Sequence, residues 1–77
     1  MAIAGAVVVP MKKEVEPLII DRLNALGKVD VLRAGPKGIA VVLEAESPRA
    51  LKRLSEDINS WKEVIEFELV YFNWEET

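Results

Sequence analysis

Apolar residues fall into blocks along the chain, and their spacing predicts six elements in the order strand, helix, strand, strand, helix, strand. The first block, residues 3–9, is continuous and contains three consecutive valines before Pro10 ends it, a pattern typical of a central strand. In the second block apolar residues recur every three or four positions, as on one face of a helix. Pro17 suits the first turn of this helix and Gly27 suits its end. The apolar positions are Val15, Leu18, Ile19, Leu23 and Leu26.

Residues 28–44 are expected to form a hairpin. Lys28–Leu32 alternates polar and apolar side chains like an edge strand, and Gly35-Pro36 followed by Gly38 favours a turn. Residues 39–43 supply the partner strand. Because successive side chains of a strand point to opposite faces, we expect Ile39, Val41 and Leu43 to face the helices and Ala40, Val42 and Glu44 to face outward.

The second helix and the last strand follow from the same arguments. Ser47-Pro48 combines a capping residue with a proline suited to the first helical position. Beyond it, Leu51, Leu54, Ile58 and Trp61 share one helix face. Residues 64–72 are then expected to form a strand, with Ile65, Phe67, Leu69 and Tyr71 on one side and Val64, Glu66, Glu68, Val70 and Phe72 on the other.

This order of elements predicts an α+β fold of the ferredoxin-like βαββαβ type. Right-handed crossovers place both helices on one face of a four-stranded antiparallel sheet and leave the other face open. With 77 residues, we expect a single domain over 1–77. The sequence does not determine which side of the first strand meets the helices, because residues 3–9 are apolar or small throughout.

Composition argues against an enzyme. The chain contains no cysteine and no histidine, which excludes disulfides, thiolate or imidazole metal sites and any mechanism with a Cys or His nucleophile or base. No serine lies in a strand–turn–helix nucleophile context. An acylphosphatase-like enzyme would need an arginine-bearing phosphate loop after the first strand, and Pro10-Met11-Lys12-Lys13 provides none. We therefore expect no catalytic residue, no metal and no cofactor.

Charge and hydropathy narrow the choice of partner. The net charge is −3, and from Glu63 onward there are five carboxylates and no cation, which disfavours nucleic acid as a partner. Lys37-Gly38-Ile39-Ala40-Val41 resembles an RNA-recognition strand, but aliphatic residues occupy the positions of the stacking rings. The opening apolar stretch ends at Pro10, too short for a membrane span or a secretory signal. We expect a cytoplasmic protein that does not insert into membranes.

The open face is the candidate binding site. Its predicted members are acidic or apolar, which suits a ligand that is both cationic and apolar. They are Ala40, Val42, Glu44, Glu66, Glu68, Val70 and Phe72.

Three runs of sequence give the chain a family resemblance. The valine-rich opening strand, the Val41-Val42-Leu43-Glu44-Ala45-Glu46-Ser47 run and the closing Glu68-Leu69-Val70-Tyr71-Phe72 run together resemble the NapD family, from about residue 3 to residue 75. The family often has histidine at the position of Phe72. NapD proteins are small cytoplasmic chaperones of ferredoxin-like fold that assist maturation of the periplasmic nitrate reductase catalytic subunit.

The resemblance implies recognition of the twin-arginine signal peptide of that subunit, or of a related molybdoenzyme, by a monomer or weak dimer. Such a peptide carries adjacent arginines followed by an apolar stretch, and holding it would delay export until the molybdenum cofactor is inserted. The alternative is a regulatory domain of the same topology that senses a small molecule such as an amino acid. Stable dimerisation and thermal stabilisation by an amino acid would distinguish it.

Overall fold

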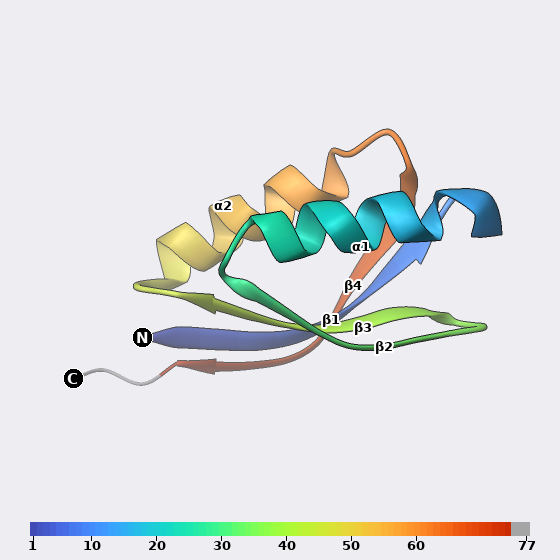
Figure 1. Ribbon diagram of the computed structural model, residues 1–77. Helices are drawn as coiled ribbons and strands as arrows, with labels where there is room; N and C mark the ends of the chain where they lie inside the picture. Colours follow the sequence, from blue (N-terminus) through green and yellow to red (C-terminus); the bar gives the residue numbers. More distant parts are fainter. Residues whose placement is uncertain (75–77) are drawn as a thin grey trace.

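The computed structural model describes the backbone of residues 1–74 and the side chains of residues 1–72. The four strands form one antiparallel sheet in the order β2-β3-β1-β4, and both helices cover the same face of it (Figure 1). The expected ferredoxin-like α+β fold, with a central first strand, is confirmed. The elements are β1 (Ala2–Pro10), the 3₁₀ helix η1 (Lys13–Val15), α1 (Glu16–Ala25), β2 (Val29–Gly35), β3 (Gly38–Ala45), α2 (Pro48–Asn59) and β4 (Val64–Trp74).

The β2–β3 hairpin closes through a turn at Pro36 and Lys37, between the paired residues Gly35 and Gly38. Gly38 has a φ of +132°, a backbone conformation that residues with a side chain rarely adopt. A Cβ there would also lie only 2.9 Å from the backbone oxygen of Val8 on β1. The glycine therefore allows the hairpin to start β3 in close contact with the central strand.

Helix α1 begins and ends as predicted, with Pro17 in its first turn and Gly27 in a left-handed conformation, φ +72°, just beyond it. The predicted apolar face is partly wrong. Leu18 is exposed, whereas Ile20 packs against the core beside the buried Ile19 and Leu23. Successive residues are about 100° apart around a helix. The face that meets the sheet is therefore centred on the Ile19 side of the helix, and Leu18 is rotated away from it.

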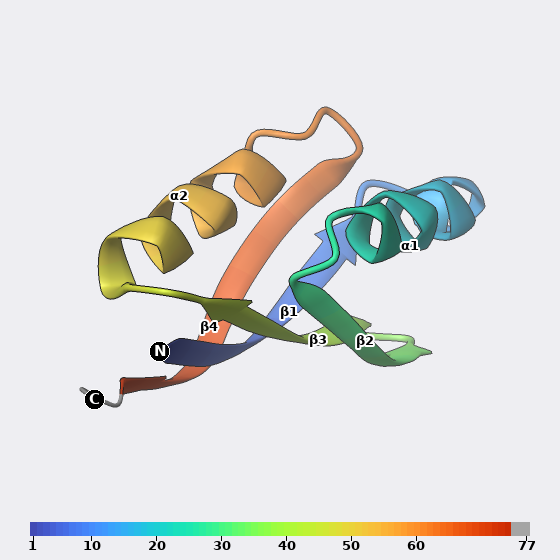
Figure 2. The ribbon, with the colours of Figure 1, turned by 60° about the vertical axis from the view of Figure 1, so that its left-hand side comes forward.

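Helix α2 is capped by Ser47, whose Oγ accepts a hydrogen bond of 3.1 Å from the backbone N–H of Ala50. Leu51 and Ile58 are fully buried against the sheet, as their spacing predicted. The helix lies beside β4, and α1 covers the other half of the same sheet face (Figure 2).

A surface contact connects the two halves of this helical layer. The guanidinium of Arg22 on α1 donates a 2.8 Å hydrogen bond to the carboxylate of Glu63, in the segment between α2 and β4. The same guanidinium lies 5.6 Å from the ring centroid of Trp61. Because Arg22 is exposed, we expect the ion pair itself to contribute at most about 1 kcal/mol.

The core lies between the helices and the inner face of the sheet. Alternate residues of β1 point into it: Ala2, Ala4 and Val8 are completely buried and Ala6 nearly so. This burial settles the facing of β1 that its own sequence left open. The buried residues of the other elements that join it are Ile19, Leu23, Val29, Ile39, Val41, Leu43, Ala45, Leu51, Ile58 and Val64.

Candidate functional site

The uncovered face of the sheet is built around the residues of β1 that alternate with its buried ones. Because Ala4, Ala6 and Val8 point toward the helices, Gly5, Val7 and Val9 belong to the opposite face. Antiparallel partners directly across from each other share a face, so the register with β3 and β4 identifies the rest of this surface. We call it the open face.

Two irregularities in the pairing of β4 with β1 determine which side chains of β4 reach the open face. Ala6 pairs with Leu69 but Gly5 pairs with Tyr71, so Val70 is an extra, unpaired residue. A second shift between Val9 and Pro10 leaves Ile65 unpaired in the same way. Each is a β-bulge, which changes the phase of the strand relative to its partner.

Between the two bulges the predicted facing of β4 is confirmed. Glu66 pairs with Val9 and Glu68 pairs with Val7, so both carboxylates belong to the open face, while Phe67 packs against the core. Two residues along a strand are about 6.6 Å apart, so the two carboxylates form one acidic edge. Neither has an ion pair or a side-chain hydrogen bond within the described part of the chain. They are therefore available to a cationic ligand.

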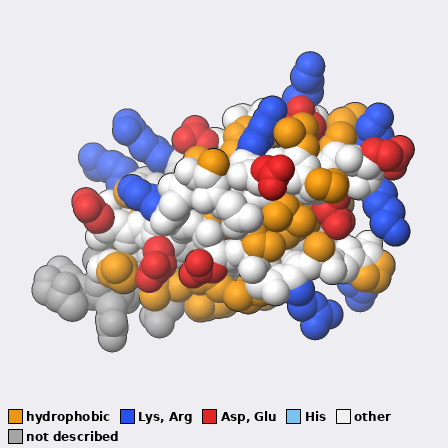
Figure 3. Space-filling model, viewed as in Figure 1, with side chains coloured by type: hydrophobic (Ala, Val, Ile, Leu, Met, Phe, Trp, Pro, Cys, Tyr) orange, Lys and Arg blue, Asp and Glu red, His pale blue; other side chains and the backbone are white. Residues whose placement is uncertain are grey.

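The row of residues across the sheet at Val7 shows how charge is distributed on this face. Arg33 on β2, Ala40 on β3, Val7 on β1 and Glu68 on β4 are successive partners. With strands about 4.8 Å apart, the backbone positions of Arg33 and Glu68 are roughly 14 Å apart, with small apolar residues between them. Seen from the side, hydrophobic side chains form a band along the sheet side of the molecule with acidic side chains beside it (Figure 3).

Glu44 does not join the acidic edge. It pairs with Ile3, four residues along β1 from the partner of Glu68, which corresponds to about 13 Å. Ala40 and Val42 do lie on the open face, as predicted, where they are partly buried. The structure thus brings Glu66 and Glu68 together near the apolar centre and leaves Glu44 at the opposite end of the face.

Tyr71 is a member of the open face that alternation placed on the other side. It pairs with Gly5, and its ring lies so close that a Cβ on Gly5 would be 2.6 Å from two ring carbons. The sequence does contain a signal for this arrangement. An isolated glycine within a strand pattern suggests a bulge or a close approach, and Gly5 lies opposite the bulge at Val70.

Phe72 is a predicted open-face residue that the structure places elsewhere, and Val70 before it is the unpaired bulge residue, 63% exposed. Beyond the bulge at Val70 it pairs with the buried Ala4, so it belongs to the helix side of the sheet. The extra residue at Val70 reverses the alternation on which the prediction depended. Val64 is also buried on the helix side rather than outward, because the second bulge separates it from Glu66.

Phe72 instead contributes to a groove of about 340 Å³ between α2 and β4. We call this the α2–β4 groove. Leu69 and Phe72 line it and are both half exposed, at 50%. The remaining lining residues are Pro48, Leu51, Lys52, Ser55, Glu56, Asn59 and Phe67.

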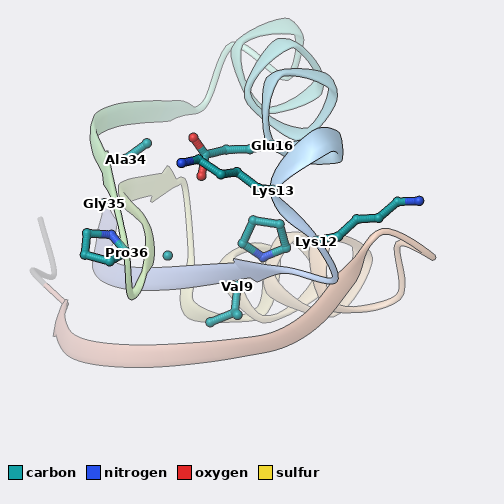
Figure 4. A pocket seen from close by; sticks show the side chains of 9 residues that line it. Val9, Lys12, Lys13, Glu16, Ala34, Gly35 and Pro36 are labelled. Carbon is teal, nitrogen blue, oxygen red and sulfur yellow. The ribbon is translucent and has the colours of Figure 1, made fainter.

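A larger cavity, of about 540 Å³, opens between the tip of the β2–β3 hairpin and the start of α1. Lys13 and Glu16 lie side by side in it, Lys12 points away, and Ala34, Gly35 and Pro36 form the opposite wall (Figure 4). Its charged side chains are of both signs, and none of its lining residues belongs to β4. The cavity therefore shares no lining residue with the acidic edge.

The open face presents carboxylates and the phenol of Tyr71 beside valines and Ala40, a combination that fits a cation with an apolar continuation. Among residues 1–74, no helix is long and apolar enough to cross a membrane.

Comparison with known proteins agrees with the family resemblance. A search among curated proteins and one among solved structures each found no match. The family model described as NapD protein matches residues 1–76, which is nearly the whole chain. The protein therefore belongs to the NapD family, whose role is that of a chaperone in nitrate reductase maturation.

Proposed function

We propose that this protein binds the twin-arginine signal peptide of a periplasmic nitrate reductase catalytic subunit, or of a related molybdoenzyme, and delays export until the cofactor is inserted. Binding takes place in the cytoplasm, by a monomer or weak dimer. The observation that carries the proposal is the pair Glu66 and Glu68, two exposed carboxylates without an intramolecular partner in the described residues, beside an apolar surface.

The two kinds of contact contribute differently. An exposed Arg–Glu pair contributes about 0–1 kcal/mol, so two such pairs cannot supply the affinity alone. Burial of about 400 Å² of apolar surface contributes about 10 kcal/mol before the costs of association and ordering. The carboxylates therefore select arginines, and the apolar part of the peptide supplies most of the affinity.

Titration of the protein with a synthetic twin-arginine peptide tests this proposal. We expect the double variant Glu66→Lys plus Glu68→Lys to weaken binding roughly tenfold or more, because attraction is replaced by repulsion at both positions. The loss should shrink as salt is added, since exposed charges are screened within about 10 Å at 0.1 M salt. A peptide with glutamines in place of its arginines should show no such loss.

A matched control is available on the helical layer. Glu14 and Asp21 are also exposed carboxylates, so Glu14→Lys plus Asp21→Lys changes the net charge by the same amount on the other side of the molecule. If both double variants weaken peptide binding equally, the effect depends on net charge alone, and Glu66 and Glu68 have no specific role. A stable dimer that is thermally stabilised by an amino acid, and not by the peptide, would favour a small-molecule sensor instead.

A further inference from the structure

The open face alone provides limited apolar contact area. The apolar residues across the sheet from Glu66 and Glu68 are Val9, Val7 and Ala40, whose side chains are short and already partly buried in the sheet. The ring of Tyr71 covers Gly5 in the next row. A flat surface of half-buried small residues leaves little area to exclude from water, whereas ligand sites that bury much of their occupant are concave.

The α2–β4 groove has the properties that the open face lacks. Its volume of about 340 Å³ lies within the range of ligand pockets, and Leu69 and Phe72 present large, half-exposed apolar side chains. Its charged lining residues are one cation, Lys52, and one anion, Glu56. A groove with an apolar floor and no net charge fits an uncharged apolar segment rather than an arginine.

The groove and the acidic edge are the two sides of a single strand. Leu69 faces the helix side of β4, while Glu68, the preceding residue, faces the open side. β4 is an edge strand with a neighbour on one side only, β1. A polypeptide can therefore pass around the outer margin of β4 and contact both surfaces.

We propose that the α2–β4 groove holds the apolar stretch of the signal peptide whose arginines contact Glu66 and Glu68, so that the peptide straddles β4. This inference rests on the proposed function and adds a second contact surface to it. Each part of the peptide then contacts the surface that matches it chemically. The two carboxylates lie on one face of the edge strand, and the apolar groove lies on the other.

Two peptides and three single variants test the proposal in the full chain. One peptide keeps the arginines and the apolar stretch, and the other keeps the arginines but has serine and glycine in place of the apolar stretch. We expect Leu69→Ser and Phe72→Ser each to weaken binding of the first peptide roughly tenfold and binding of the second by less than about twofold. Ile65→Ser is the matched control, because Ile65 is on the same strand, 69% exposed, and outside the groove.

The outcomes separate this inference from the proposed function. If Leu69→Ser and Phe72→Ser bind the first peptide like the wild type while the Glu66 and Glu68 variants weaken it, the groove is not the site and the proposed function stands. If the wild type binds neither peptide, the proposed function fails.

A second measurement avoids substitutions that could disturb folding. An amine-reactive crosslinker placed in the apolar stretch of the first peptide should modify Lys52, which lines the groove, as read by mass spectrometry of the digested complex. Modification of Lys12 or Lys13 in preference to Lys52 would overturn the proposal.

Discussion

The contact between Gly5 and Tyr71 provides a quantitative test of how the open face is packed. A Cβ added to Gly5 would lie 2.6 Å from Cδ1 and from Cε1 of the Tyr71 ring. Carbon atoms in contact normally lie about 3.5–4.0 Å apart, so the ring has to move. Tyr71 is half exposed, and its ring can turn toward solvent without disturbing the core.

Two opposing effects determine the stability of Gly5→Ala. Alanine in the middle of a strand is more favourable than glycine by about 0.5–1 kcal/mol. Against this, forcing the ring off its preferred rotamer costs about 0.5–1.5 kcal/mol, and the ring contact with β1 is lost as well. In the wild-type background we therefore expect a change in the free energy of unfolding between roughly zero and a loss of about 1 kcal/mol.

The background Tyr71→Ser separates the two effects. Without the ring there is no clash, and Gly5→Ala should then stabilise the protein by about 0.5–1 kcal/mol. The coupling free energy between positions 5 and 71 should accordingly be about 1 kcal/mol, measured by urea unfolding of the four proteins of a double-mutant cycle. Equal effects of Gly5→Ala in both backgrounds would refute the packing described above.

Gly35 supplies the control for this cycle. An added Cβ there meets nothing within 4 Å, so Gly35→Ala and Tyr71→Ser should be additive within about 0.5 kcal/mol.

Two further substitutions test the local structure. Gly38→Ala should destabilise the protein by about 2–3 kcal/mol, because it combines a positive φ with a Cβ close to the backbone oxygen of Val8, and a loss below about 0.5 kcal/mol in urea unfolding would contradict this geometry. Ser47→Ala should cost about 1 kcal/mol by removing the cap of α2, whereas Ser47→Asp should keep most of the stability, as read from thermal unfolding followed by circular dichroism.

Most of the fold could be predicted because local signals and the overall arrangement agree. Gly35-Pro36 with Gly38 marks the hairpin, and Ser47-Pro48 marks the start of α2, each by a backbone requirement that few other residues meet. The facing of β1 could not be predicted, since its residues are apolar or small on both faces. Which face is buried depends on the helices, which cover the side of Ala4 and Ala6.

The facing of β4 was predicted correctly only where the strand pairs regularly with β1. Glu66 and Glu68 lie between the two bulges, and their predicted facing is correct. Phe72 lies beyond one bulge, and its predicted facing is wrong. A bulge is a property of the pairing with β1, and residues 69–72, which are all apolar, give no sign of which face each one takes.

The bulges of β4 also bear on the behaviour of the protein at high concentration. A long strand at the margin of a sheet, with exposed apolar side chains, is a template on which further chains can add and aggregate. In β4 the unpaired Ile65 and Val70 interrupt the regular geometry that such addition requires, and Glu66 and Glu68 add like-charge repulsion between copies. Both features disfavour the addition of further chains at the free margin of β4.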